Sequence, residues 1–397
     1  MLLCDTLTTG GAETFVLRLA HALRERGHDV LLAILRGDRI ERALVDSIAP
    51  GVSIASLQLF GLPVLLRLDG IFQTLGMGFS LLRWVQQRWL ARLISSYRPS
   101  VVHSHLITCD LVAAHACNEA GKRWLSTMHG DYLAMELSGS NRAARVQNFG
   151  QAIANIEVGI DAIVCITDDQ QNQVRRLMPQ LATRDGIHKI YNGYPRSREE
   201  ATLLLPHLLR EIPEDHLVIG MVARGIREKG WDVMLEGFRL ANLTNAWLVL
   251  VGDGSRIAEL RQLIDDSRVL FAGSVTDPLN YIRRFDIACL PSLFTTESLP
   301  TVIIEYLQQG KPVLATHVGE IPAMLRIDTP DVAGVTIPLE SEAAMTKSMS
   351  ASLRALGKDE ALRSRLAQAS LRAFEPFNMD ACVHQYECLY RELMHDP

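Results

Sequence analysis

Two cations in one short segment are suited to binding phosphate. Arg224 and Lys229 lie five positions apart, after the apolar run Leu217–Val222 and before a helical pattern. In an alternating α/β chain such a segment is a loop at the carboxyl end of a strand, where ligands bind. A guanidinium and an ammonium group there can hold the two phosphates of a nucleotide diphosphate through charge-assisted hydrogen bonds. The alternative is a solvated charge cluster, an interpretation that Arg227 and Glu228 fit well.

Two carboxylates, Glu297 and Glu305, stand eight positions apart around a predicted helix start at Pro300. Proline is favoured as the first helical residue, so Glu297 belongs to the preceding loop and Glu305 to the helix body. Glu297 can then face a ligand at the helix start, and Glu305 suits a ribose diol. The alternatives are a helix-capping acid at 297 and an exposed helix residue at 305. The second alternative is less favourable, because Glu305 has apolar neighbours.

The segment Thr8–Glu13 contains a Gly-Gly pair that follows a predicted strand and opens a predicted helix. Backbone N–H groups at a helix start bind anions, and Gly11 lets a phosphate approach the backbone closely. The alternative is a plain turn, because the full dinucleotide-binding fingerprint is missing.

Histidines follow two other predicted strands. His129 begins His129-Gly-Asp131 directly after a strand, where a ligand contact is well placed. His103 and His105 flank another strand end and, with Asp131, are possible acceptor-side residues. A structural role is the alternative, and it is the commoner one for a single histidine.

Several familiar sites are missing from the sequence. There is no Asp-x-Asp pair, so we expect no metal-bridged diphosphate and no cofactor, with Arg224 and Lys229 in the metal's place. There is no Gly-x-Ser-x-Gly elbow and no Walker phosphate loop. The seven cysteines lack metal-ligand spacing, which is typical of reduced, buried thiols in a cytosolic protein. No dense basic-aromatic segment points to nucleic acid.

The elements that position these residues alternate between short β-like runs and helical patterns, which predicts parallel sheets covered by helices. At 397 residues the chain exceeds what one core usually serves. Up to Arg198 there are 21 Lys and Arg against 17 Asp and Glu, and beyond it 19 against 28. This asymmetry favours two doubly wound α/β domains, joined by a linker near Asn192–Arg210.

The predicted strands are Met1–Asp5, Val30–Leu35, Val101–Ser104, Trp124–Met128, Ala162–Ile166 and His188–Tyr191, then Leu217–Val222, Trp247–Val251, Val269–Ala272, Ile287–Leu290, Pro312–Ala315 and Gly334–Ile337. The predicted helices include Ala12–Arg26, Leu81–Tyr97, Leu111–Ala120, Asp169–Leu177, Trp231–Ala241, Arg256–Ile264, Pro300–Gln308 and Asn378–Met394.

The region 63–98 has five arginines and a single acid, Asp69. Within Leu81–Tyr97 arginines alternate with Trp84 and Trp89, a composition that suits a helix on an anionic bilayer surface. The alternative is a helix packed on the sheet with its arginines in solvent. The apolar stretch 61–80 ahead of it favours membrane contact. No apolar run reaches the roughly 18 residues of a membrane span, so we expect a cytoplasmic protein, peripheral at most.

These segments together resemble the retaining glycosyltransferases of family 4, in the GT-B superfamily, over nearly the whole chain. The motifs are Gly-Gly-Ala-Glu (10–13), Val-Val-His-Ser-His (101–105), Thr-Met-His-Gly-Asp (127–131), Tyr-Asn-Gly-Tyr (191–194), Arg224…Lys229-Gly230, Leu-Val-Gly-Asp-Gly (250–254) and the stretch 291–319. Their order and spacing are more specific than any one of them.

The resemblance implies two facing Rossmann-like domains, an acceptor-binding domain at 1–195 and a nucleotide-sugar-binding domain at 211–375. A last helix within 376–397 would return to the first domain. The donor would be a UDP- or GDP-linked sugar. The acceptor would be a glycan or a lipid-linked molecule, as in cell-surface polysaccharide, lipopolysaccharide or glycolipid biosynthesis, and the anomeric configuration would be retained.

The resemblance also assigns roles to residues. Arg224, Lys229 and Gly11 would hold the diphosphate, and Glu305 the ribose. Glu297 would contact the transferred sugar, and His129 would lie near the reacting centre. The donor-sugar loop would comprise Ser298, Leu299 and Thr301.

The chain departs from the family pattern in three places. Met1 begins inside the predicted first strand, Tyr306–Gln309 replaces a run of small residues, and Glu320 stands where a second glycine is common. Two other functions remain open: a catalytically inactive scaffold of this fold that binds glycans or partners, and a nucleotide-sugar epimerase. The pairs Arg224/Lys229 and Glu297/Glu305 fit the epimerase less well.

Overall fold

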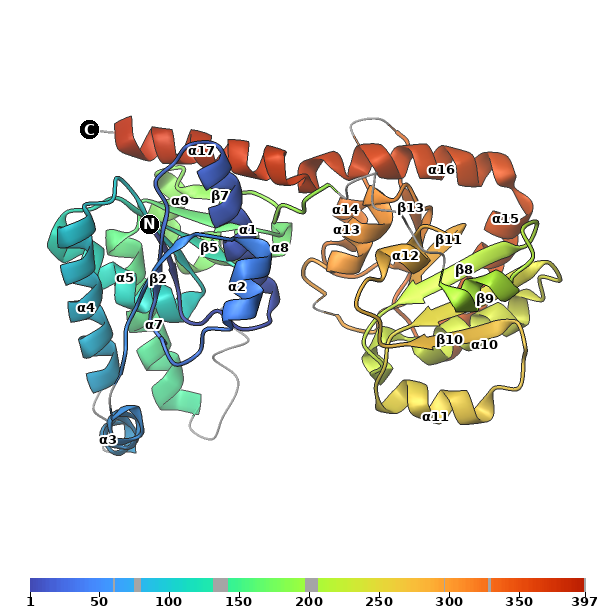
Figure 1. Cartoon of the computed structure of the whole chain (residues 1–397), viewed down its shortest axis with the longest axis horizontal. Coiled ribbons are helices and arrows are strands. Elements are labelled where there is room, and N and C mark those ends of the chain that lie inside the picture. Colours follow the sequence, from blue (N-terminus) through green and yellow to red (C-terminus); the bar gives the residue numbers. More distant parts are fainter. Residues whose placement is uncertain are drawn as a thin grey trace. The chain divides into compact units, whose positions relative to one another are not determined.

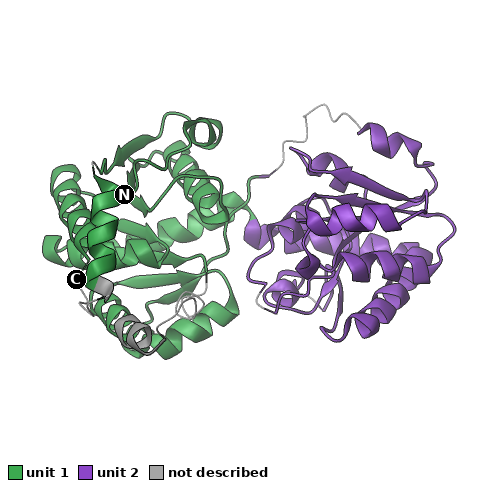
Figure 2. Cartoon of the chain, turned by 90° about the horizontal axis from the view of Figure 1, so that it is seen from below, with its two compact units in different colours: residues 1–195, 378–397 green, residues 196–377 purple. Residues whose placement is uncertain are grey.

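The chain divides into two compact units. The computed structural model describes residues 1–59, 61–74, 80–130, 142–196, 206–295, 297–327 and 330–395. Unit 1 comprises 1–195 together with 378–397, and unit 2 comprises 196–377 (Figure 2). The boundary after Pro195 lies within the stretch predicted as a linker.

Unit 1, blue to green in Figure 1 with its last helix in red, is built on a seven-stranded parallel sheet. Its strand order is β3-β2-β1-β4-β5-β6-β7. Its strands are β1 Leu2–Cys4, β2 Leu31–Ile34, β3 Ser53–Ser56, β4 Val102–His105, β5 Trp124–Met128, β6 Ala162–Cys165 and β7 Ile187–Lys189. Its helices are α1 Gly11–Glu25, α2 Arg42–Ile48, α3 Leu62–Thr74, α4 Leu81–Tyr97, α5 Ile107–Ala120, α7 Arg142–Gly159, α8 Asp168–Leu177, α9 Pro179–Thr183 and α17 Met379–His395.

Helices cover both faces of this sheet, and each face has its own core. One core joins the sheet to α1, α2 and α17, and the other joins it to α4, α5, α7, α8 and α9. Because side chains alternate along a strand, β4 sends Val102 and His103 to opposite faces. Val102 belongs to the second core, whereas the His103 ring lies against Tyr386 of α17.

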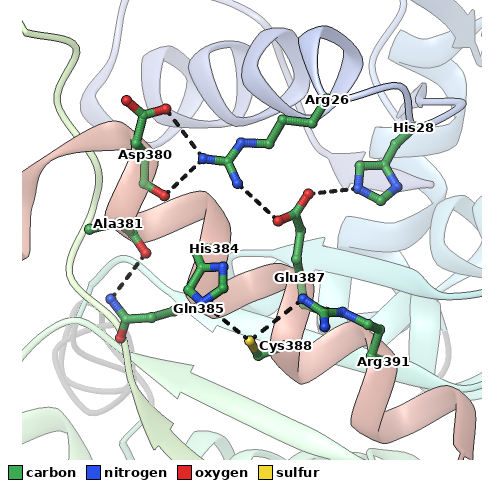
Figure 3. A network of polar contacts seen from close by, with 9 residues as sticks. All are labelled: Arg26, His28, Asp380, Ala381, His384, Gln385, Glu387, Cys388 and Arg391. Atoms are coloured by element: carbon green, nitrogen blue, oxygen red, sulfur yellow. Dashed lines mark hydrogen bonds and ion pairs between the residues drawn. The ribbon is translucent and has the colours of Figure 1, made fainter.

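The returning helix α17 is held against α1 by buried apolar side chains and by surface charges. Arg26, which caps α1, bonds to Asp380 and Glu387, and His28 bonds to the other oxygen of Glu387 (Figure 3). These contacts join positions more than 350 residues apart in sequence. The last segment of the chain is therefore an integral part of unit 1.

Unit 2 has a six-stranded parallel sheet with strand order β10-β9-β8-β11-β12-β13. Its strands are β8 Leu217–Val222, β9 Ala246–Val251, β10 Val269–Gly273, β11 Ile287–Leu290, β12 Val313–Thr316 and β13 Gly334–Ile337. Its helices are α10 Trp231–Ala241, α11 Ser255–Leu263, α12 Leu279–Ile282, α13 Thr301–Gln308, α14 Ile321–Met324, α15 Glu342–Lys358 and α16 Glu360–Ala373, with the short 3₁₀ turns η1 His207–Glu211, η2 Arg227–Lys229 and η3 Glu375–Phe377.

The predicted fold class, two doubly wound parallel-sheet domains, is confirmed. Strands Leu217–Val222 and Ile287–Leu290 and helix Trp231–Ala241 have the predicted bounds. The helix predicted from Pro300 begins one residue later, with Pro300 in extended conformation as its N-cap. Strand β3 was not predicted, because its sequence Ser-Ile-Ala-Ser is only half apolar and it lies at the sheet edge. Among the described residues, none of the helices is both long and apolar enough to cross a membrane.

Candidate functional site

Arg224 lies just after β8, as predicted, and its side chain points to solvent. The residue is exposed, and its side chain forms no hydrogen bond or ion pair within the described ranges. Its backbone is fixed, because its carbonyl accepts a hydrogen bond of 2.9 Å from the buried indole of Trp231. The loop therefore holds an uncompensated cation in a defined place, which is what an anion site needs.

Neighbouring residues of this loop have structural partners. Arg227 forms an ion pair with Glu342 at the surface, so the solvated-charge interpretation is confirmed for it. The Gly225 N–H donates to the Asp253 carbonyl at 2.8 Å, and Arg256 donates back to the Gly225 carbonyl at 3.0 Å. The loops after β8 and β9 are thus joined backbone to backbone, which explains the Gly-Asp-Gly motif at 252–254.

Lys229 and Glu297, predicted from separate segments, form an ion pair. The ammonium nitrogen is 2.9 Å from each oxygen of the carboxylate, and the two side chains are only 12% and 11% exposed. The hydroxyl of Ser292 donates to the same carboxylate at 2.5 Å. The ammonium also lies 5.0 Å from the ring centre of Phe294, within range of a cation–π contact. The structure therefore joins a predicted phosphate ligand to a predicted sugar ligand.

Two glycines allow the loops around this pair to meet. Gly230 has φ +76°, and a Cβ there would lie 1.9 Å from the carbonyl oxygen of Pro291. Gly319 has φ +51°, and a Cβ there would lie 1.6 Å from the carbonyl oxygen of Glu297. Glycine alone combines this conformation with such an approach. The loop after β11 thus meets the loop after β8 at Pro291 and the loop after β12 at the Glu297 backbone.

Glu305 is half-buried on α13, whereas the next residue turns into the core. The Tyr306 hydroxyl accepts from the Val222 N–H at 2.9 Å and donates to the Cys289 carbonyl at 3.2 Å. Burial raises the pKa of Tyr306 well above its ordinary value, so the hydroxyl stays neutral. Tyr306, which stands where the family pattern has a small residue, therefore links the ends of β8 and β11.

The remaining predicted residues of unit 2 lie close to this pair in sequence. Ser298 and Leu299 are half-buried in the loop before α13, and Thr301 is exposed at its first turn. Their predicted role at the donor sugar stays a prediction, as does that of Glu305.

In unit 1, Gly11 is the exposed first residue of α1, and nothing lies within 4 Å of where its Cβ would be. The cap residue Gly10 is extended and provides no side-chain hydrogen bond. Glu13 in the first turn accepts a hydrogen bond of 3.1 Å from Thr6, a favourable place for a carboxylate beside the helix dipole. The predicted phosphate contact of Gly11 stays a prediction.

The three predicted histidines lie together. His103 is bonded on both ring nitrogens, to Tyr390 and Thr127, each at 2.7 Å. His105 Nδ1 is 3.0 Å from His129 Nε2. Burial lowers the pKa of all three, that of His129 to about 3, so the rings are neutral at ordinary pH. Asp131 lies outside the described residues.

Several residues at these sites were not predicted. They are Ser292, Phe294, Thr127, Asn192, Tyr386 and Tyr390. Thr127 and Asn192 belong to quoted motifs without a role, Ser292 and Phe294 lie within the quoted stretch 291–319, and the two tyrosines stand one turn apart on α17.

Two family models match the chain. "Glycosyltransferase Family 4" matches residues 9–198, and "Glycosyl transferases group 1" matches residues 216–355. The chain belongs to the family 4 glycosyltransferases. This confirms the predicted family and the prediction that the chain is a glycosyltransferase, whereas retention of configuration and transfer of a hexose stay predictions.

Relatives of this glycosyltransferase have names consistent with that assignment. The lipopolysaccharide core biosynthesis glycosyltransferase LpsD of Rhizobium meliloti is 26% identical over 365 residues, which cover 91% of this chain and 88% of that protein. The N-acetyl-alpha-D-glucosaminyl L-malate synthase of Bacillus anthracis is 28% identical over 42% of each chain. The comparisons do not favour the inactive scaffold or the epimerase.

Solved structures support the same fold. Anabaena Alr3699/HepE, in complex with UDP, superposes with a TM-score of 0.72 at 16% identity, over 98% of this chain and 99% of that one. A glycosyltransferase of Rickettsia africae superposes with a TM-score of 0.75 at 17% identity, over 100% and 98%. These likenesses identify this glycosyltransferase as a GT-B protein by fold.

Metal binding was not expected from the sequence. Within the described ranges no group of three or more His, Cys, Asp or Glu side chains could hold a metal ion. That the reaction needs no metal ion stays a prediction.

Proposed function

We propose that the enzyme transfers a sugar from a UDP- or GDP-linked donor to a glycan or lipid-linked acceptor, with retention of the anomeric configuration. Cell-surface polysaccharide or lipopolysaccharide biosynthesis is the proposed setting, because a relative is named for lipopolysaccharide core biosynthesis. The observation that carries the proposal is that Arg224, which has no side-chain partner in the described part of unit 2, and the Lys229–Glu297 pair lie on loops that follow parallel strands.

The two cations would stabilise the departing diphosphate. Negative charge grows on that group as the bond to the sugar breaks, and fixed cations lower the energy of such a state. Arg224 is available without change, whereas Lys229 must share its charge between Glu297 and the phosphate. Donor binding would therefore loosen the ion pair and leave Glu297 free to contact the transferred sugar.

The remaining roles follow from the chemistry of the donor. Glu305 would accept hydrogen bonds from the ribose hydroxyls. The leaving phosphate oxygen would accept the proton of the acceptor on the same face of the sugar, so no side chain need act as a base. This same-face attack would account for retention.

The test is a panel of UDP- and GDP-sugars measured by thermal stabilisation, because a ligand of the native state raises its stability. We expect one nucleotide to raise the melting temperature of the wild type and to do so much less in Arg224→Ala. Product analysis by NMR with that donor should then show the donor's own anomeric configuration. No stabilisation by any nucleotide-sugar would overturn the proposal.

We further propose that unit 1 binds an anionic membrane surface through α3 and α4. Val64, Leu66 and Ile71 of α3 are about half exposed. The one acid of the region, Asp69, is buried, where it accepts from the Ser80 hydroxyl at 2.6 Å and the Leu81 N–H at 2.7 Å. The arginines of the region therefore face no exposed acid of its own.

Helix α4 fits the packed interpretation as well as the membrane one. Leu90 and Ile94 are buried in the sheet-side core, whereas Trp84 is 46% exposed. Arg88 reaches Glu119 of α5 at 3.1 Å, a surface pair worth little. A helix with one face packed on the sheet and an exposed tryptophan on the other can also contact a membrane.

Sedimentation with vesicles that contain anionic lipid tests this second proposal. We expect binding at low salt, weaker binding at high salt, and loss of binding in Val64→Glu/Ile71→Glu. The control is Leu263→Glu, which changes a leucine on α11 of unit 2 that is even more exposed, at 73%. Absence of binding at low salt would remove the membrane from the proposal.

A further inference from the structure

The histidines of unit 1 form one row because of strand register. His103 and His105 alternate with Ser104 along β4, so both point to the α1/α17 face of the sheet. Their partners across β5 are Leu125 and Thr127, and His129 lies two residues further on the same face. The row therefore runs from the middle of the sheet to its carboxyl edge.

The inner part of this row is fully bonded. His103 joins Tyr390 and Thr127, and Thr127 joins the hydroxyl of Tyr386 at 2.8 Å. The rings of His103 and His105 are 4.1 Å apart with a 36° angle between their planes. Because both nitrogens of His103 are used and the ring is 1% exposed, it provides a fixed surface for His105.

The outer part is not fully bonded. Asn192 Nδ2 is 3.5 Å from His129 Nδ1, at the limit of a hydrogen bond. His105 Nε2 and Asn192 Oδ1 are buried and have no hydrogen-bond partner in the described part of the chain. Unpaired buried polar atoms are costly, and natural proteins keep them chiefly at functional sites. Two such atoms flank His129.

The protons of this group can be assigned. A neutral imidazole has one N–H donor and one acceptor nitrogen. With the amide of Asn192 donating to Nδ1, His129 must carry its proton on Nε2 and donate it to His105 Nδ1. His105 then carries its own proton on Nε2. The reverse assignment requires the amide to be turned round.

We infer that His105 and Asn192 are positioning residues that hold His129 as a neutral ring protonated on Nε2, so that Nδ1 accepts a hydrogen bond from a sugar hydroxyl. The long contact to Asn192 is the one that a hydroxyl would replace. The role against the sugar rests on the proposed function, whereas the proton assignment does not.

Histidine ¹⁵N NMR of the ligand-free full chain reads the tautomer directly, with His129→Gln used to assign the signals. We expect the Nε2–H form in the wild type and a shift towards Nδ1–H in Asn192→Asp, whose carboxylate only accepts. A wild type in the Nδ1–H form, or an unchanged tautomer in Asn192→Asp, would overturn the proton assignment. Because no donor is present, this outcome is independent of the proposed function.

Turnover separates positioning from simple packing. His105→Asn keeps an acceptor near the place of Nδ1, whereas His105→Phe keeps a ring without one. With UDP-glucose, UDP-galactose and GDP-mannose as donors, we expect kcat to fall about tenfold in His105→Phe with a smaller change in KM, and to recover in His105→Asn. Equal kcat in the two variants would overturn the positioning role. His115→Phe, an exposed histidine of α5, is the control.

If His105→Phe does not fold, Tyr390→Phe serves instead. It removes only the hydroxyl that bonds His103. His103 contacts His105, which in turn contacts His129. We expect a partial loss of the Nε2–H form of His129, because the ring that fixes His105 loses one of its two hydrogen bonds. An unchanged NMR signal together with an unchanged kcat would overturn the positioning role of His105.

Discussion

The two units place different chemistry at the same kind of position, the carboxyl ends of parallel strands. In unit 2 the contacts are ionic: Lys229 and Glu297 are bonded to each other, and Arg224, on the same loop as Lys229, has no side-chain partner among the described residues. In unit 1 the contacts are neutral, with His103, His105 and His129 kept uncharged by burial. A doubly charged phosphate group calls for cations, whereas sugar hydroxyls are recognised by neutral acceptors and donors. The difference indicates that unit 2 is suited to bind a phosphate group and unit 1 to bind sugar hydroxyls.

The two sites also differ in what holds them. In unit 2, Lys229 can exchange Glu297 for a phosphate at modest cost in free energy, because the lysine stays paired throughout. A chain of neutral hydrogen bonds has a fixed order of donors and acceptors, so one change propagates along it. We therefore expect ligand binding to change the contacts in unit 2, and a fall in pH to lower the stability of unit 1.

The largest expected effect is acid destabilisation of unit 1. Burial lowers the pKa of the three histidines in the folded state, that of His129 to about 3, so the unfolded chain binds more protons below about pH 6.5. The free energy of unfolding should therefore fall as pH falls below 6.5, by about 1.4 kcal/mol per pH unit for His129 until about pH 3, and it should fall further because the pKa values of His103 and His105 are also lowered.

Hydrogen exchange at pH 7, 6 and 5, corrected for intrinsic rates, measures this effect. Amides of β4 and β5 should lose protection with acid, whereas amides of β8 and β11 in unit 2 provide the internal reference. Equal loss in both units would contradict the comparison.

The next largest effect is expected in Lys229→Ala. It removes a proposed phosphate ligand and leaves the carboxylate of Glu297, 11% exposed, with Ser292 as its hydrogen-bond partner. We expect turnover to fall by about two decades, with a measurable loss of stability. Arg227→Ala is the matched control on the same loop, because its partner Glu342 lies at the surface and its removal should change turnover less than about twofold.

Glu297→Gln should separate sugar contact from phosphate binding. Turnover should fall by at least about tenfold, because the charge proposed to face the sugar is gone. Binding of UDP or GDP without sugar should instead become several-fold tighter, because Lys229 no longer has a competing anion. Glu305→Gln should do the opposite, with weaker nucleotide binding. Isothermal titration measures both, and weaker nucleotide binding by Glu297→Gln would show that the roles are wrongly assigned.

Arg224→Ala should reduce donor use by about one decade and leave the melting temperature unchanged. The guanidinium is exposed and unpaired in the described part of the chain, so the fold loses nothing with it. Arg224→Lys should restore part of the activity, because the charge returns without the planar fork. Near-normal turnover in Arg224→Ala would remove this residue from the diphosphate site.

The smallest expected effect is that of a chelator. With Arg224 and Lys229 in the place of a metal ion, activity should survive EDTA within about twofold, since the sequence has no Asp-x-Asp pair. A complete loss that Mg²⁺ or Mn²⁺ reverses would contradict a metal-independent mechanism. If the chelator did abolish activity, the activity of Arg224→Ala should be lost and restored by the metal ion to the same extent as that of the wild type.

Local pattern was enough to determine the fold class and the position of each charged group along it. Alternation of apolar runs with helical patterns predicted strand Leu217–Val222 and helix Trp231–Ala241 with the observed bounds. It follows that Arg224 and Lys229 lie on a loop at a strand end, because that depends only on their immediate neighbours. The order and spacing of the motifs along the chain then indicated a family that the comparisons confirm.

Tertiary structure alone decided which groups meet. Lys229 finds Glu297 across 68 positions, and Tyr306 turns into the sheet to bond Val222 and Cys289. His103 receives its partner Tyr390 from the last helix, 287 positions away. The physical reason is that a local pattern fixes a residue's element and face. Its hydrogen-bond partners depend on which strand ends become neighbours when the sheets form and on where the last helix returns.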